Sequence, residues 1–269
     1  TTVSKMIMRA LRPDSGEVLF NDRGQIIDLT QLNEKELLPY RRKMQFMFQD
    51  PFSSLNPRMT VFDIISEPLV IHKIGDKEYR AEMVQELMAL VGLDPRYLNR
   101  YPHSFSGGQR QRIGIARALA LKPELLICDE PVSALDVSVQ AQILNLMKDL
   151  QKDLGLTYLF ISHNLAVVDY IADRIAVMCA GRLVETAPRE VLFRSPVHPY
   201  TRALLSAVPE PNPDSRLDLS ALMEGKASIP SEWPEPFTIA DSREMKLIDL
   251  GEGHFVRADP NADMKALVA

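Results

Sequence analysis

Hydrophobic positions recur along the chain with the spacing of helices and strands, and the first pattern is a short helix followed by a hairpin. The apolar residues at helical spacing in residues 3–11 are Val3, Ile7, Ala10 and Leu11. Pro13 ends this pattern. Two strand-like runs follow, GEVLF and QIIDL, and the turn residues NDRG join them. The opening segment is therefore predicted to form a helix and then a β-hairpin.

The middle of the chain alternates between helical and strand patterns. A helical stretch after MQFMFQDP has its apolar residues on one face, namely Met83, Leu87, Leu90 and Val91. The runs ELLICDE and LTYLFISH are short and apolar, as buried parallel strands are, and residues 138–153 between them form an amphipathic helix. Together with the later strand pair RIAVMC and RLVE, this order predicts an α/β fold. Helices would cover a mainly parallel sheet, and ligands would bind at the carboxyl ends of its strands.

The last third of the chain is richer in proline than the rest. Ten of its 19 prolines lie at or after Pro188. Because proline interrupts the hydrogen bonding of strands, we expect residues 188–269 to form an extension and not more sheet.

Composition and charge narrow the possible functions. The chain has 269 residues, 46% of them hydrophobic, and a net charge of −5, so it offers no broad basic surface for nucleic acid. The one short basic cluster, Arg41 to Lys43, is interpreted as solvated surface. No apolar run approaches the roughly 18 residues of a membrane-spanning helix, and no signal peptide is recognisable, so a membrane role must come through partners. Cys128 and Cys179 stand singly in apolar runs, which predicts buried thiols in a reducing compartment and neither a disulfide nor a metal site.

An acidic pair carries the first candidate chemistry. Asp129 and Glu130 directly follow a predicted buried strand. At such a position one carboxylate can hold a hydrated Mg²⁺, and the next can orient and polarise an attacking water. An acidic pair is also common where a strand simply reaches solvent, so by itself it is a weak indication of catalysis.

The segment HSFSGGQRQRIGIARALAL, residues 103–121, is more specific. Ser106 can cap the helix that follows, while Gly107 and Gly108 let backbone N–H groups approach an anion at the positive end of the helix dipole. The alternative is a glycine turn before an ordinary core helix, whose arginines are solvated. The full segment, with the acidic pair a few residues later, favours a phosphate site.

These motifs resemble those of the ATP-binding cassette (ABC) ATPases, and the resemblance extends over nearly the whole chain. FSGGQ, which runs from Phe105 to Gln109, is similar to the family's signature motif, and LLICDE is similar to its Walker B motif. Gln49 in MFQDP matches the glutamine loop, SALD ending at Asp136 matches the loop that crosses the dimer interface, and His163 matches the switch histidine. The resemblance implies a P-loop NTPase-like sheet with an inserted helical subdomain and a C-terminal extension.

The same resemblance implies a composite ATP site. The residues that would serve one nucleotide within the chain are Thr1, Gln49, Asp129, Glu130 and His163. Of these, Glu130 and His163 would be catalytic, and the Mg²⁺ contacts would come from Thr1, Gln49 and Asp129. Ser106 to Gln109 and Asp136 would reach the nucleotide bound by a second cassette.

The first residues fit this family too. There the corresponding helix follows a loop of pattern G-x-x-x-x-G-K-[ST], so Thr1 would be the residue that coordinates Mg²⁺ and Thr2 its neighbour in ATP binding. On this interpretation the chain begins just after the lysine of that loop. We expect the chain as given to bind ATP poorly and to hydrolyse it negligibly without the upstream segment.

The segments FQDPFSSLNPRMTV and SPVHPYTRALLSAVP are similar to those of the oligopeptide and dipeptide importer ATPases. In these, an HPYT-type segment, here His198 to Thr201, opens a C-terminal extension. The resemblance divides the chain into an ABC ATPase domain at 1–187, with a helical subdomain at about 60–115, and an extension at 188–269. Some relatives bind an iron–sulphur cluster in the extension, but no cysteine follows Cys179 here, so none is expected.

The implied function is that of a peripheral ATPase at the cytoplasmic face of the inner, or plasma, membrane. It would dimerise with a second ATPase subunit or tandem cassette around ATP and Mg²⁺. It would drive transmembrane permease subunits that import peptides or similar small solutes, supplied indirectly by an extracytoplasmic solute-binding protein. The permease would dock on apolar side chains of residues 52–61, such as Leu55, with the helix around Met83 to Leu90 behind them.

Two other functions are compatible with parts of the sequence. A non-transport cassette ATPase would act in DNA repair or on the ribosome. However, Phe105 follows Gln49 by only 56 positions, which leaves no room for the long coiled coil of the repair type, and the ribosomal type lacks the HPYT segment. A nucleotide-sensing scaffold without turnover is disfavoured because Glu130 and His163 are both present. The transported solute and the composition of the dimer stay open.

Overall fold

A computed structural model describes residues 1–48, 54–207, 226–239 and 244–263. The chain divides into two compact units, Thr1–His163 and Asn164–Ala269. Among the residues described, no helix is both long and apolar enough to span a membrane.

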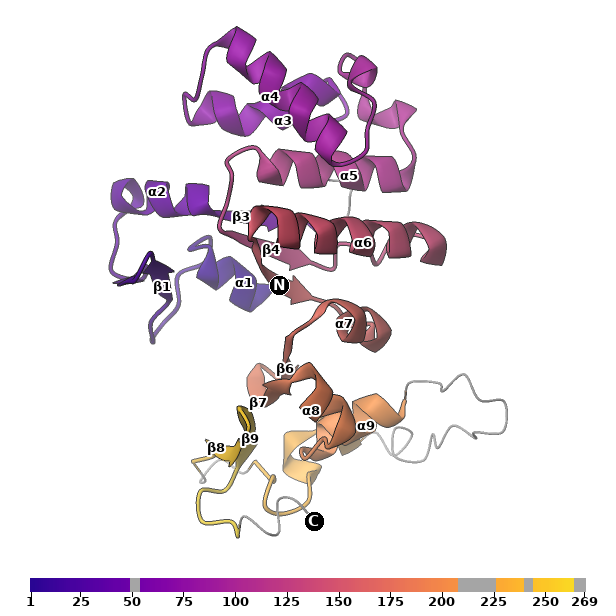
Figure 1. Ribbon diagram of the computed structural model, residues 1–269. Helices are drawn as coiled ribbons and strands as arrows, with labels where there is room; N and C mark the ends of the chain where they lie inside the picture. Colours follow the sequence, from indigo (N-terminus) through magenta and orange to yellow (C-terminus); the bar gives the residue numbers. More distant parts are fainter. Residues whose placement is uncertain (49–53, 208–225, 240–243, 264–269) are drawn as a thin grey trace. The chain divides into compact units, whose positions relative to one another are not determined.

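A three-stranded parallel sheet lies at the centre of the first unit (Figure 1). Its order is β3–β4–β5, and its strands are β3 (Met44–Met47), β4 (Leu125–Asp129) and β5 (Thr157–Ile161). The parallel strands expected at ELLICDE and LTYLFISH are therefore present, although only β4 is largely buried and the residues of β5 are partly or fully exposed. β4 is central, and its residues from Leu126 to Asp129 are buried because a partner strand lies on each side and helices cover the sheet.

The expected hairpin precedes this sheet. β1 (Leu19–Asp22) and β2 (Gln25–Asp28) pair antiparallel, with Asp22 opposite Gln25. Gly24, in the two-residue turn, has φ of +94°, a conformation that favours glycine. The hairpin then leads into α2 (Glu34–Lys43), which a capping box at Asn33 begins.

The first helix differs from the expectation. α1 covers Thr2–Ile7 and not residues 3–11. Its buried residue is Ser4, whereas Val3 and Leu11 of the expected apolar face are exposed. The helix ends early because Arg9 adopts φ of 56°, in the left-handed region, where its guanidinium donates to the Leu29 carbonyl oxygen at 2.7 Å. Apolar spacing thus located this helix but predicted neither its length nor its buried face.

Three helices, which we call the helical subdomain, pack together, and α3 and α4 lie against α5 (Figure 1). They are α3 (Val61–Ile71), α4 (Lys77–Leu90) and α5 (Gly107–Leu119). Capping boxes at Thr60 and Ser106 begin α3 and α5. The 3₁₀ turns η1 (Pro95–Tyr97) and η2 (Pro102–Ser104) connect α4 to α5.

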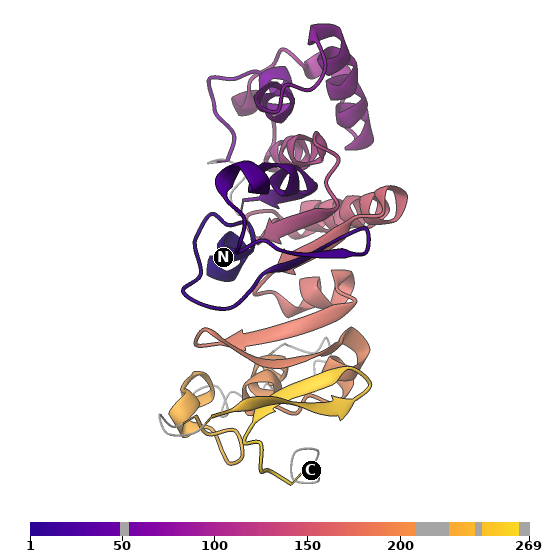
Figure 2. The same ribbon diagram turned by 90° about the vertical axis from the view of Figure 1, so that its left-hand side faces the viewer.

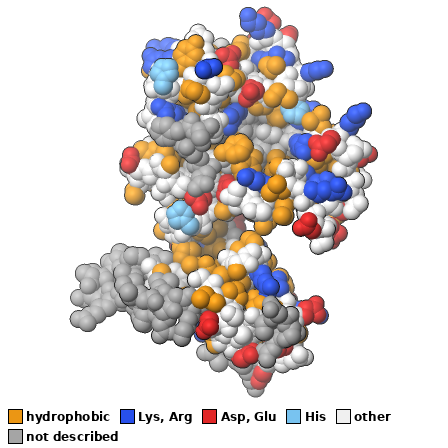
Figure 3. Space-filling model, turned by 180° about the vertical axis from the view of Figure 1, so that it is seen from behind, with side chains coloured by type: hydrophobic (Ala, Val, Ile, Leu, Met, Phe, Trp, Pro, Cys, Tyr) orange, Lys and Arg blue, Asp and Glu red, His pale blue; other side chains and the backbone are white. Residues whose placement is uncertain are grey.

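The amphipathic helix expected at residues 138–153 is α6 (Val137–Leu154). It buries Ile143, Met147 and Leu150, and Gly155 ends it in the left-handed conformation with φ of 65°. Over the surface of this unit that faces the viewer in Figure 3, hydrophobic side chains lie in small groups among charged ones.

The second unit has its own antiparallel sheet, of order β6–β7–β9–β8 (Figure 2). The strands are β6 (Arg174–Cys179), β7 (Arg182–Pro188), β8 (Lys246–Gly251) and β9 (His254–Ala258). The expectation that residues 188–269 add no strands was therefore wrong. β9 pairs with β7 across about 70 positions, Glu185 opposite Val256, and a proline-rich composition between the two strands carries no information about such a long-range pairing.

Short helices complete this unit: α7 (Leu165–Ile171), α8 (Arg189–Arg194) and α9 (Pro199–Ser206), with 3₁₀ turns η3 (Lys226–Ser228) and η4 (Pro230–Glu232). Its core contains Val184, Leu192, Trp233 and Val256. Cys179 belongs to the same core, and Cys128 lies in β4 of the first unit. Both are free and buried, as expected, and burial raises the pKa of the Cys128 thiol.

Candidate functional site

The carboxyl end of β4 lies beside the beginning of α1. Thr1 Oγ1 donates a hydrogen bond to Asp129 Oδ2 at 2.6 Å, across 128 positions of sequence. Asp129 is buried, while Thr1 and its neighbour Thr2 are exposed. Figure 2 shows α1 next to the strands of the parallel sheet. A hydroxyl oxygen and a carboxylate thus meet at the edge of the sheet where the sequence predicts a ligand.

This pair of oxygen atoms suits Mg²⁺. The ion prefers oxygen ligands and usually keeps several waters, so one or two protein ligands together with substrate phosphates are sufficient to hold it. No cluster of three or more His, Cys, Asp or Glu side chains that could bind a metal occurs in the described parts of the chain. Thr1 and Asp129 therefore fit an ion that is shared with a phosphate ligand better than one held by protein alone.

Glu130 and His163 form a second pair beside the first. His163 Nδ1 lies 3.1 Å from Glu130 Oε1, and the imidazole is largely exposed. Glu130 has φ of 49°, and its N–H donates to the Ile161 carbonyl oxygen at 2.9 Å. A non-glycine residue in this region is strained, and such residues concentrate at functional sites. The side chains of Glu130 and His163 lie close together because β4 pairs with β5, which places the ends of both strands side by side.

The start of α5 has the features expected of a phosphate site. Ser106 Oγ accepts the Gln109 N–H at 3.4 Å, and the Gln109 side chain accepts the Ser106 N–H at 3.0 Å. The first turn contains no acidic residue, so no side chain of its own offsets the positive end of the helix dipole. Gly107 occupies the first position of the helix, where its N–H has no partner within the helix.

Helix packing also requires glycine at position 108. A β-carbon at this position would lie 2.4 Å from Cγ1 of Val139 in α6, which is closer than atoms can approach. The sequence interpretation assigned this glycine to anion access alone. The structure shows that its missing side chain also permits the close packing of α5 on α6.

The arginines of α5 bind backbone carbonyl groups and are not simply solvated. Arg110 donates to the carbonyl oxygens of Pro102 and Phe105 at 2.8 and 3.0 Å. Arg112 donates to Val91 at 2.6 Å, and Arg117 donates to Ser54 at 2.8 Å. No local pattern predicted these partners, because an arginine side chain reaches far from its own position in the sequence.

The SALD segment lies at the surface. Asp136 is the N-cap residue of α6 without a side-chain capping bond, and Val137 is 83% exposed. Ser133 Oγ donates to the Glu130 carbonyl oxygen at 3.1 Å, which links this segment to the strained residue after β4. Because α5 packs on α6, the surface around Asp136 neighbours the signature motif.

The docking surface expected at residues 52–61 is corrected by the structure. Leu55 is 2% exposed and Val61 is fully buried, so both fill the core and offer no surface. Met59 is half-buried. Gln49 and Phe52 lie outside the described residues. Apolar composition between two prolines did not distinguish a buried segment from an exposed one.

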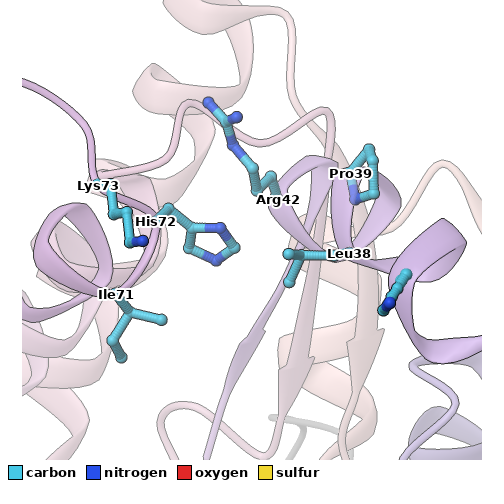
Figure 4. A pocket seen from close by; sticks show the side chains of 7 residues that line it. Leu38, Pro39, Arg42, Ile71, His72 and Lys73 are labelled. Atoms are coloured by element: carbon cyan, nitrogen blue, oxygen red, sulfur yellow. The ribbon is translucent and has the colours of Figure 1, made fainter.

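A pocket that the sequence did not indicate lies between α2 and the end of α3. It has a volume of about 490 Å³ and is lined by Lys35, Leu38, Pro39, Arg42, Ile71, His72 and Lys73. We call it the α2–α3 pocket. Figure 4 shows His72 between Lys73 and Arg42, with its ring directed toward α2. Burial, and secondarily the charge of Arg42, lowers the pKa of His72.

The basic cluster Arg41 to Lys43 is also less solvated than expected. Lys43 forms an ion pair with Asp22 and a second one with Glu124 at 3.5 Å, and Arg41 pairs with Glu34 at 2.7 Å. The hydrogen bond from Lys43 to Asp22 raises the pKa of the lysine. Only Arg42 of the cluster is directed to the α2–α3 pocket.

Comparison with known proteins identifies the family. The family described as "ABC transporter" matches residues 1–133, and the family described as "Oligopeptide/dipeptide transporter, C-terminal region" matches residues 184–235. The oligopeptide transport ATP-binding protein OppF of Bacillus subtilis is 51% identical, over 99% of this chain and 84% of its own.

Solved structures show the same fold. The dimeric structure of MJ0796, a bacterial ABC transporter cassette, is 30% identical with a TM-score of 0.60, over 70% of this chain and 79% of its own. The structure of cbiO1 from Clostridium perfringens, part of the ABC transporter complex cbiONQ, is 26% identical with a TM-score of 0.63, over 72% of this chain and 74% of its own. The chain therefore belongs to the ABC transporter family, as an ATP-binding and ATP-hydrolysing subunit of the oligopeptide and dipeptide importer type.

Proposed function

We propose that Thr1, Asp129, Glu130 and His163, which we call the ATP half-site, bind and hydrolyse ATP together with Mg²⁺. This hydrolysis powers the uptake of peptides through a membrane permease. The observation that carries this proposal is the 2.6 Å hydrogen bond between Thr1 and Asp129. It supports these two residues as the protein ligands of Mg²⁺, with Gln49 as the further ligand expected from its motif. When bound, the ion supplies positive charge to the phosphate oxygens.

Glu130 and His163 supply the hydrolytic groups. Glu130 accepts a proton from the attacking water, whose oxygen bonds to the γ-phosphorus while the bond to the bridging oxygen breaks, which leaves ADP and phosphate. His163, whose Nδ1 lies 3.1 Å from the Glu130 carboxylate, orients that carboxylate, and its other ring nitrogen is left to contact the γ-phosphate. The backbone of Glu130 is held by its hydrogen bond to Ile161, so the carboxylate needs little reorganisation to act.

A second copy of the cassette, or a homologous one, completes each site. Ser106 to Gln109 present the positive end of α5, and Asp136 stands exposed at the start of neighbouring α6. These residues contact the nucleotide held by the partner, so two ATP molecules lie between two cassettes. The dimeric state of the MJ0796 cassette supports this arrangement.

The α2–α3 pocket is the docking site for the permease. Leu38 and Ile71 are 48% and 67% exposed and provide apolar contacts, while Lys35, Arg42 and Lys73 provide positive charge. The residues that line the pocket include no acidic one. Its occupant is therefore a short amphipathic helix of the permease with acidic residues at its edge. Such docking holds the chain at the cytoplasmic face of the membrane, and a solute-binding protein delivers peptides on the other side.

The first test replaces the proposed base. It uses a chain in which a glycine-rich phosphate loop and its lysine precede Thr1, which we call the extended chain. Glu130→Gln keeps the shape of the side chain but cannot accept the proton, so turnover should fall by about 10²- to 10⁴-fold while ATP binding persists. Steady-state hydrolysis and nucleotide binding measure the two effects, and ATP should hold the variant as a dimer.

The matched control is Glu124→Gln, at the opposite end of β4, where the carboxylate pairs with Lys43. This variant should keep turnover within about twofold of the parent. Equal turnover in the Glu130 and Glu124 variants would remove Glu130 from the catalytic role.

The second test concerns docking. Because Ile71 is exposed, Ile71→Glu should leave folding unchanged, yet it places a negative charge in the pocket and should abolish co-purification with the permease. Leu154→Glu is the control, since Leu154 is a 47% exposed apolar residue at the end of α6. Loss of the permease from both variants, or from neither, would contradict the assignment of the pocket. Leu55→Asp, by contrast, should unfold the subdomain, because Leu55 is 2% exposed and fills the core.

A further inference from the structure

Arg117 joins the helix that begins with the signature motif to a distant part of the helical subdomain. Its Nη1 donates to the Ser54 carbonyl oxygen at 2.8 Å, across 63 positions of sequence. Arg117 stands in the last turn of α5, 11 positions after Ser106, and at 1.5 Å per residue this is about 16 Å along the helix axis. One straight helix therefore connects the Ser54 carbonyl to the proposed phosphate site.

The surroundings make this contact stiff. Arg117 is partly buried, and burial lowers the pKa of its guanidinium, while the charge of Glu67 in α3 acts in the opposite direction. Because a guanidinium withdrawn from water requires acceptors, and hydrogen bonds are stronger in a region of low dielectric constant, water does not readily replace the Ser54 carbonyl group. The position of α5 is thus tied to that of Ser54.

The segment beyond Ser54 leads directly into α3. Leu55 is 2% exposed and Val61, the first residue of α3, is fully buried, so these two side chains anchor residues 54–61 in the subdomain core, while Asn56 to Arg58 between them are exposed. α3 packs on α5 and ends at Ile71, which lines the α2–α3 pocket. A continuous packed body therefore extends from that pocket to the contact with Arg117.

We propose that Arg117 is a positioning residue that couples occupation of the α2–α3 pocket to the placement of the signature motif. This inference rests on the proposed function, in which the pocket receives the permease. A shift of α3 and residues 54–61 on docking is carried through the guanidinium to α5, and thereby to Ser106 and the glycines at the start of the helix. In this role Arg117 acts through α5 and not directly on the nucleotide.

Arg112 provides a matched control. It lies on the same helix, and its Nη1 also donates to a backbone carbonyl oxygen, that of Val91 at 2.6 Å. Val91 is the C-cap residue of α4, however, and does not belong to residues 54–61. Loss of Arg112 removes a bond of the same kind without cutting the proposed connection.

The experiment measures hydrolysis by the extended chain alone and with the purified permease in lipid vesicles. Arg117→Met removes the hydrogen bond and keeps the apolar length of the side chain. Stimulation of turnover by the permease should fall by about three- to thirtyfold, whereas the KM for ATP and basal turnover should stay within about twofold of the parent. Arg117→Lys, which can still donate one bond to Ser54, should recover most of the stimulation, and Arg112→Met should retain it.

Several outcomes would overturn the proposal. Unchanged stimulation in Arg117→Met, or an equal loss in Arg112→Met, shows that the contact does not couple the two sites. If Arg117→Met does not fold, Arg117→Gln takes its place, and if neither folds, Arg117 is only structural. Failure of the parent extended chain to hydrolyse ATP or to retain the permease is a different result, because it contradicts the proposed function itself.

Discussion

His198 illustrates how much the role of one residue depends on its surroundings. From the sequence it is only the first residue of an HPYT segment. In the structure it is fully buried, and its Nδ1 accepts the Tyr200 N–H at 3.1 Å to cap α9. Its ring lies edge-on to Trp233, with the ring centroids 4.5 Å apart. His198 therefore organises the fold of the second unit.

Burial lowers the pKa of His198 from 6.5 to about 4. Because the unfolded chain takes up the proton near pH 6.5 and the folded chain does not, the contribution of His198 to stability is complete above pH 6.5. It should be lost as the pH falls from 6.5 toward 4, by about 3 kcal/mol in total. Denaturant unfolding at several pH values measures this loss, and the fluorescence of Trp233, the chain's one tryptophan, reports on this unit.

The control for this prediction is His198→Asn, which can cap a helix but does not titrate. Its unfolding free energy should depend less steeply on pH between 6.5 and 4 than that of the parent. The same slope in both proteins would show that another group causes the loss.

At the scale of elements, the packing of α5 on α6 explains the signature glycine Gly108 better than a phosphate site alone. Gly108 faces Val139, and no space is left for a side chain between the helices. Gly114, one and a half turns further along α5, has no neighbour within 4 Å of an added β-carbon. The absence of a side chain therefore matters for packing at Gly108 but not at Gly114.

Gly108→Ala should destabilise the first unit by about 1–3 kcal/mol, because α5 and α6 must separate to admit the new methyl group. The same change at Gly114 should stabilise it by about 0.5–1 kcal/mol, since alanine is the better helix former and space is available. Denaturant unfolding of the two variants tests both signs. Equal effects at the two positions would contradict the packing argument.

At the scale of the whole molecule, the chain consists of two units with separate cores, and a buried polar cluster holds the second one together. Glu185 in β7 is fully buried and accepts the N–H groups of Val197 and His198 at 2.8 and 3.0 Å. His254 Nε2 of β9 lies 2.7 Å from the same carboxylate. One side chain therefore connects β7, the segment before α9 and the last strand, which the sequence places far apart.

The local sequence was sufficient to predict those helices and strands that depend only on residues close to them in the chain. The hairpin at residues 19–28, the strands at ELLICDE and LTYLFISH and the helix α6 follow from alternation, turn residues and helical spacing over fewer than twenty positions. The order of the motifs was likewise enough to identify the family. The site roles of residues such as Glu130 and Asp136 remain predictions, and the geometry of the described residues supports them.

Tertiary structure decided everything that depends on which distant segments meet. The hydrogen bond from Thr1 to Asp129, the carbonyl partner of Arg117 and the pairing of β9 with β7 all join residues more than 60 positions apart. The burial of Leu55 likewise depends on distant segments and could not be predicted from the local sequence. An apolar side chain can fill a core or meet a partner, and an arginine can face water or a carbonyl group. Only the packing of the folded chain selects between these, because the local pattern is identical in both cases.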